Sequence, residues 1–192
     1  NNNYTAFTNA VIFITPNEVI KNGTLLIQDG KVIASGKSLT IPENAIIIDL
    51  NGKYIYPSFI DLYSGFGVSK PEKAKRERSP QYETKREGFY WNDHIKPENK
   101  AIDKFKYASK KADELRKAGF GVVNSHIMDG IARGTGVLVT LNDEGTNSER
   151  IINDISGQYF SFKKSQASRQ SYPSSHMGSI ALLKQFQHDA KW

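Results

Sequence analysis

The sequence predicts an α/β protein in which a small antiparallel β unit precedes a region of alternating helices and strands. Short β-branched segments separated by turn residues fill the first part of the chain, as is typical of antiparallel sheets. Farther on, an amphipathic helix ends at Gly119 and a strand follows at once, a succession typical of parallel sheets and barrels. We expect residues 1–57 to form one domain and residues 58–192 the other.

The first domain is expected to consist of short strands joined by tight turns. Asp29-Gly30 and Asn51-Gly52 are dipeptides that favour two-residue hairpins, so each predicts an antiparallel strand pair. We therefore expect an antiparallel β-sandwich of two packed sheets. Its strands are predicted at Val11–Ile14, Thr24–Gln28, Lys31–Ser35, Ala45–Leu50 and Lys53–Tyr56.

The second domain is expected to begin with a strand at Phe59–Leu62. Apolar residues then recur at three- and four-residue steps after Pro97, which predicts a helix that ends at Gly119. Further strands are predicted at Phe120–Asn124 and Thr135–Leu141, and a final helix is predicted after an N-cap at Ser174 or Ser175.

Composition excludes several classes of protein. The chain has 192 residues, 38% of them hydrophobic, and no cysteine, so disulfides and thiolate metal sites are absent. No apolar stretch approaches the ~20 residues of a membrane-spanning helix. The sequence starts at Asn1 without a methionine, so we expect a processed chain, and the compartment stays open between the cytoplasm and export to a periplasm with loss of a signal peptide.

A charged insertion is expected at about residues 68–96, where the sequence shows no clear period. The net charge of +6 raises the question of nucleic acid, but the basic residues here alternate with glutamates, and the aromatic residues Phe89, Tyr90 and Trp91 form one cluster. We therefore expect a solvated loop and do not favour nucleic acid as a partner. The basic residues are Lys70, Lys73, Lys75, Arg76, Arg78, Lys85 and Arg86.

The order and spacing of several short motifs resemble those of the amidohydrolase superfamily, in particular the imidazolonepropionase-like and dihydroorotase-like enzymes. The matching segments are residues 8–11, 23–36, 48–53 and 56–61. The resemblance implies a composite β-sandwich domain that leads into the first strand of a (β/α)8 TIM-type barrel. Only a partial barrel is expected, because a complete one takes about 250 residues.

The same resemblance implies that the metal site of the family is degenerate here. The family pattern continues Pro-Gly-Phe-Ile-Asp-x-His-x-His, and its two histidines bind the catalytic metal; Tyr63 and Gly65 stand at those positions, and Asp61 is retained. Glycine offers no ligand, and a neutral tyrosine is a poor one. We expect no metal in this chain, and zinc or another divalent ion only if the full-length protein is active.

We interpret the chain as the front of a longer polypeptide, similar to a variant found in large bacterial amidohydrolase-like proteins. The resemblance implies a relationship to metal-dependent hydrolases of C–N bonds in cyclic amides or peptides, inactive as this chain alone. The alternative is a non-catalytic binding or structural module that packs against an active hydrolase domain. The expected partner is the remainder of the polypeptide or a second copy of the chain.

A few other residues are candidates for chemistry. Asp61, His126 and Asp129 are candidate catalytic residues, although a hydrogen-bonded histidine at a strand end would explain His126 equally well. Arg133 and Gly134 lie in a glycine-rich loop that could bind an anion, and the alternative is an ordinary tight turn.

Overall fold

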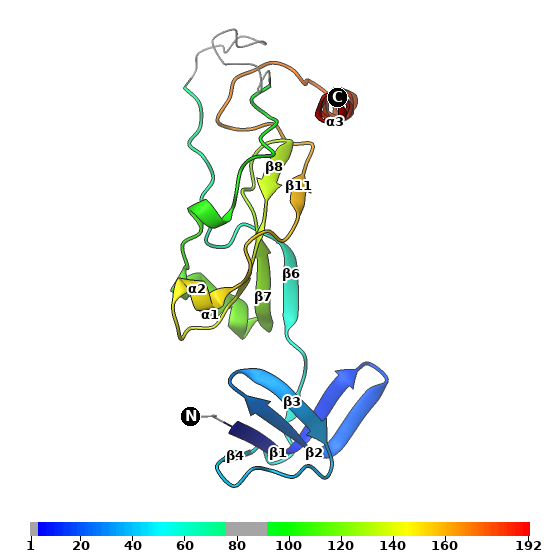
Figure 1. Cartoon of the computed structure of the whole chain (residues 1–192), viewed down its shortest axis with the longest axis vertical. Helices are drawn as coiled ribbons and strands as arrows, with labels where there is room; N and C mark the ends of the chain where they lie inside the picture. Colours follow the sequence, from blue (N-terminus) through cyan, green and yellow to red (C-terminus); the bar gives the residue numbers. More distant parts are fainter. Residues whose placement is uncertain (1–3, 76–91) are drawn as a thin grey trace. The chain divides into compact units, whose positions relative to one another are not determined.

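The computed structural model describes residues 4–75 and 92–192. The chain divides into two compact units, the first ending at Ser58 and the second beginning at Phe59. Both units contain β-sheets, and the described helices belong to the second unit (Figure 1). The predicted α/β class is therefore confirmed.

The described part of the first unit is one five-stranded sheet. Its strands lie in the order β3-β2-β1-β4, and β5 also pairs with β1. The predicted hairpin at Asp29-Gly30 is confirmed, because Gln28 faces Lys31 and both turn residues have positive φ, 48° and 77°. The strands are β1 (Tyr4–Thr15), β2 (Glu18–Gln28), β3 (Lys31–Gly36), β4 (Ile46–Asp49) and β5 (Tyr54–Ile55).

The predicted antiparallel sandwich is wrong for the last two strands of this unit, because β4 and β5 both run parallel to β1. Asn51 and Gly52 do form a tight turn, with φ of 49° and 80°, but the strands on either side of it do not pair with each other. The amide of Gly52 donates to the Asn9 carbonyl at 2.7 Å, and the Asn9 side chain donates to Asp49 Oδ2 at 3.0 Å. These bonds return the chain to the same edge of β1, so β4 and β5 occupy successive stretches of it.

The second unit contains a four-stranded sheet in the order β10-β9-β7-β6 and a two-stranded sheet of β8 and β11. Only the β6–β7 pair of the larger sheet is parallel; β9 pairs antiparallel with both β7 and β10. The helix-then-strand pattern predicted parallel pairing, and this is confirmed for β6 and β7, which lie on either side of α1 in the sequence. The prediction is wrong for β9, because no helix separates β7 from β9 and parallel neighbours need a long crossover. The strands are β6 (Phe59–Ser64), β7 (Phe120–Ser125), β8 (Ala132–Thr135), β9 (Val137–Thr140), β10 (Ile151–Asn153) and β11 (Gln158–Phe160).

The helix predicted between Pro97 and Gly119 forms only in its last part. The segment contains a 3-10 turn, η1 (Ile102–Lys104), and then α1 (Ser109–Lys117). Between them the backbone is engaged elsewhere, since Phe105 bridges to Val68 and the amide of Lys106 donates to the Gly67 carbonyl at 2.8 Å. Gly119 ends α1 as predicted, with a φ of 92°.

Two further helices belong to this unit, α2 (Asn147–Arg150) and α3 (His176–Lys191). Ser175 caps α3 by accepting a hydrogen bond from the amide of Gly178 at 3.0 Å, so the second of the two predicted caps is the one used. None of the helices in the described ranges is long and apolar enough to cross a bilayer.

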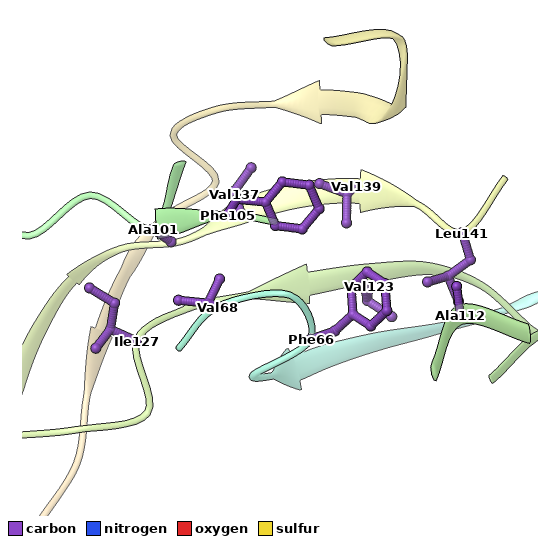
Figure 2. Close-up of a cluster of buried hydrophobic side chains, with 10 residues drawn as sticks. All are labelled: Phe66, Val68, Ala101, Phe105, Ala112, Val123, Ile127, Val137, Val139 and Leu141. Carbon is purple, nitrogen blue, oxygen red and sulfur yellow. The ribbon is translucent and has the colours of Figure 1, made fainter. Parts of the chain in front are cut away.

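A continuous apolar core supports the larger sheet of the second unit. Figure 2 shows ten of its buried side chains, which come from β7, β9 and α1, from both sides of η1, and from the segments that follow β6, β7 and β9. This packing fixes the ends of β6 and β7, where the candidate site lies. The ten are Phe66, Val68, Ala101, Phe105, Ala112, Val123, Ile127, Val137, Val139 and Leu141.

The predicted charged insertion is described only up to residue 75 and from residue 92. Four of its basic residues (Arg76, Arg78, Lys85 and Arg86) and the aromatic cluster at residues 89–91 lie outside the described residues.

Candidate functional site

Three of the residues singled out from the sequence meet where β6 and β7 end. Tyr63 is the penultimate residue of β6, Gly65 follows that strand, and His126 follows β7 directly. Because the two strands are parallel and Ser64 pairs with Ser125, both strands end at the same edge of the sheet. The amide of His126 donates to the Ser64 carbonyl at 2.9 Å, which joins the two ends.

Arg133 reaches this point from β8, a strand of the two-stranded sheet. Its Nη1 donates to the Tyr63 hydroxyl oxygen at 2.6 Å and to His126 Nε2 at 3.0 Å, while its Nε donates to the Gly130 carbonyl at 3.1 Å. The Arg133 side chain is 2% exposed and His126 is 0% exposed, so these bonds lie in the interior of the unit. Arg133 was a candidate for anion binding in the sequence, but no sequence signal placed it on Tyr63 and His126.

The contact with Arg133 defines the tautomer of His126. A guanidinium has only donors, so Nε2 of His126 must carry its lone pair toward Arg133, and the proton of the neutral ring lies on Nδ1. This Nδ1 has no hydrogen-bond partner among the described residues. Burial, and next the charge of Arg133, lower the pKa of His126 from 6.5 to about 4, against the opposing effect of the Asp61 carboxylate.

Tyr159 closes the site and was not foreseen from the sequence. Its ring stacks on the His126 ring, with centroids 3.8 Å apart and planes 7° apart, and its hydroxyl donates to the Leu62 carbonyl at 3.0 Å. Burial raises the pKa of Tyr159, so its hydroxyl remains protonated at neutral pH. Tyr159 reaches His126 because β11 pairs with β8, a long-range pairing that no local motif announces.

Asp61 and Asp129, the two candidate carboxylates, each accept a hydrogen bond from a backbone amide. Asp61 accepts a hydrogen bond from the amide of Tyr63 at 3.0 Å. Asp129 accepts from the hydroxyl of Ser165 and, at 2.8 Å, from the amide of Gln166, so it anchors the loop after β11.

The two candidate glycines lie in tight surroundings. Gly134 has a φ of 87° within β8, and a Cβ there would lie 2.0 Å from the Asn99 carbonyl oxygen. A Cβ on Gly65 would lie 2.9 Å from the sulfur of Met128, a side chain that can move. Gly134 thus meets a steric requirement of the backbone, whereas Gly65 leaves room for a modest change.

The residues at the strand ends do not fit a catalytic metal ion. A zinc ligand must present a lone pair to the ion, but the Nε2 lone pair of His126 is used by Arg133 and its Nδ1 carries the proton. The positive charge of Arg133 also repels a divalent ion. Residues 4–75 and 92–192 contain no group of three His, Cys, Asp or Glu side chains that could hold one.

Comparison with known proteins identifies the architecture. An amidohydrolase from Thermotoga maritima superposes with a TM-score of 0.72 over 97% of this chain, at 24% sequence identity. The chain has an amidohydrolase fold. It spans about half (47%) of the length of that protein. A second solved amidohydrolase is 29% identical over 31% of this chain and 15% of its own, with a TM-score of 0.29, and it adds nothing to the argument. No family model matches the sequence, and no curated protein matches it.

Proposed function

We propose that this chain is an amidohydrolase-superfamily module, related to metal-dependent hydrolases of C–N bonds and catalytically inactive on its own. Its fold matches that of a solved amidohydrolase over 97% of its length. The sequence motifs of the first domain and of β6 also follow the order of that superfamily. In this proposal the second unit corresponds to the first part of a (β/α)8 barrel.

The observation that carries the proposal is the arrangement around Arg133. The superfamily uses imidazole lone pairs at a strand end to hold the ion that activates water. Here Tyr63 stands at the first of these positions, and both its oxygen and His126 Nε2 accept hydrogen bonds from Arg133. With those lone pairs occupied, the chain has no means of generating a metal-bound hydroxide at this site.

The test is metal analysis of the purified chain together with a hydrolysis panel of a dihydropyrimidine, a hydantoin and a dipeptide. We expect less than a stoichiometric amount of zinc, iron or manganese after incubation with each ion, and no turnover above a protein-free blank. The His126→Ala variant is the control for contaminating enzymes. Metal-dependent turnover by the unaltered chain that disappears in His126→Ala would refute the proposal.

A second observation favours a structural role beside an active domain. The strand β6 ends the sheet order β10-β9-β7-β6, so one of its edges has no strand partner within the described residues. Phe59, Ile60 and Leu62 on this strand are 65%, 55% and 68% exposed. Unpaired apolar edges of this kind invite another strand. We propose that the remainder of a longer polypeptide covers β6, supported by the 47% coverage of the related amidohydrolase.

This second proposal is tested by sedimentation of the isolated chain. An uncovered β6 makes the chain self-associate as concentration rises, and Leu62→Lys reduces that association, whereas Met177→Lys, on the exposed face of α3, does not. A stable dimer of defined stoichiometry would instead identify a second copy as the occupant. A chain that stays monomeric at every concentration contradicts the idea of an uncovered edge.

A further inference from the structure

Arg133 carries a buried positive charge that is held by neutral groups. Within the described residues it forms no ion pair with a carboxylate; its acceptors are the Gly130 carbonyl, the Tyr63 hydroxyl and His126 Nε2. Burying a charge costs free energy unless the charge is well hydrogen-bonded or paired. An apolar side chain would avoid this cost, so a guanidinium in this position points to a specific role for its charge.

The two side chains that Arg133 joins come from different strand ends. Tyr63 belongs to β6 and His126 follows β7, while Arg133 belongs to β8. One nitrogen, Nη1, contacts both acceptors, at 2.6 Å and 3.0 Å. Nη1 thus lies between two lone pairs from separate strand ends, as a metal ion lies between two of its ligands.

We propose that the Arg133 guanidinium is a built-in cation that takes the place of a metal ion at the ends of β6 and β7. This inference rests on the proposed function and extends it, because it explains what organises the site once the metal is lost. The lone pairs that would face an ion instead accept hydrogen bonds from a permanent +1 charge. Arginine is suited to this role because it stays protonated at any physiological pH and offers five donors in a rigid fork.

The surroundings of Arg133 support a permanent rather than an exchangeable cation. The stacked ring of Tyr159 covers His126, and the Tyr159 hydroxyl is bonded to the backbone of β6. The Arg133 guanidinium carbon also lies 5.7 Å from the centre of the Tyr63 ring, within the range of a cation–π contact. A metal ion could therefore displace the guanidinium from this position only if several of these contacts broke together.

The experiment uses chemical rescue of the Arg133→Ala variant. We expect its melting temperature to fall by roughly 10 °C. Millimolar ethylguanidinium, which replaces the lost group, should restore part of that loss, whereas the same concentration of ethylammonium should not. The matched control is Arg150→Ala. Arg150 is also buried, but it donates to the carbonyls of Asn142 and Asp143 and joins no pair of strand ends.

Metal binding supplies the second measurement, with cobalt as a visible probe. The Tyr63→His variant should bind Co²⁺ no better than the unaltered chain, because Arg133 still donates hydrogen bonds to the lone pairs of both imidazoles. The double variant Tyr63→His/Arg133→Ala should bind it at least roughly tenfold more tightly than Tyr63→His alone. This comparison remains informative if Arg133→Ala by itself folds poorly, because Co²⁺ then also stabilises the double variant.

These outcomes test the built-in cation separately from the proposed function. Selective rescue by ethylguanidinium together with the cobalt gain supports the built-in cation. Equal rescue of Arg133→Ala and Arg150→Ala, or equal cobalt affinity of the single and double variants, overturns it. Neither result depends on hydrolysis, so the turnover assay of the unaltered chain tests the proposed function separately.

Discussion

Acidification is expected to destabilise the second unit through His126. The folded-state pKa of His126 is about 4, whereas an exposed histidine in the unfolded chain titrates near 6.5. Between these two pH values the unfolded chain binds more protons than the folded one. The contribution of neutral His126 to the free energy of unfolding is therefore fully present above pH 6.5 and is lost as the pH falls toward 4.

The size of the effect follows from the same two pKa values. Each pH unit of difference corresponds to about 1.36 kcal/mol, so His126 alone accounts for a loss of about 3 kcal/mol between pH 6.5 and pH 4. His94 contributes in the same direction, because burial lowers its pKa as well. The loss is a large fraction of the 5–15 kcal/mol that is typical of natural domains.

Urea denaturation at a series of pH values from 7.5 to 4.5 measures this loss. The variant His126→Gln is the informative one, since glutamine can still accept a hydrogen bond from Arg133 but does not titrate. His188→Gln is the control, because His188 is an exposed residue of α3. We expect the pH dependence to become distinctly shallower in His126→Gln. An unchanged slope in that variant, or an NMR titration of His126 near 6.5, would refute the reasoning.

Two further predictions concern the residues around the site. Gly134→Ala should lower the free energy of unfolding by about 3 kcal/mol or more in urea denaturation, because φ is positive and the added Cβ meets the Asn99 carbonyl, whereas Gly52→Ala, with nothing within 4 Å, should cost only about 1 kcal/mol. An equal cost for the two substitutions would contradict the close approach at Asn99. Tyr159→Ala should raise the pKa of His126 toward 6.5 in an NMR titration, since it admits water to the ring, and a pKa still near 4 would show that Tyr159 does not exclude solvent.

Features governed by neighbouring residues could be predicted from the sequence. The Asp29-Gly30 hairpin depends on two residues that accept positive φ, and the end of α1 depends on Gly119, so local chemistry was sufficient for both. The Ser175 cap of α3 is of the same kind. The position of His126 at the end of β7 also followed from a short apolar run, because a strand ends where its buried segment ends.

Features governed by distant residues could not be predicted in this way. The parallel pairing of β4 and β5 with β1 depends on bonds between Asn9 and the Asp49–Gly52 segment, some forty residues away. The contact of Arg133 with Tyr63 spans seventy residues. Helix periodicity between Pro97 and Gly119 likewise failed where the backbone of Phe105 pairs with Val68, since tertiary pairing overrides local propensity.

The arginine at the strand ends also has a consequence for biosynthesis. A metalloprotein must acquire its ion after translation, and its folding is coupled to the supply of that ion. Arg133 is incorporated by the ribosome with the rest of β8, in a fixed ratio of one per chain. Under the proposed role of Arg133, folding of this region needs no ion from the surroundings, and we expect chelators or metal starvation to leave the charge at the site unchanged.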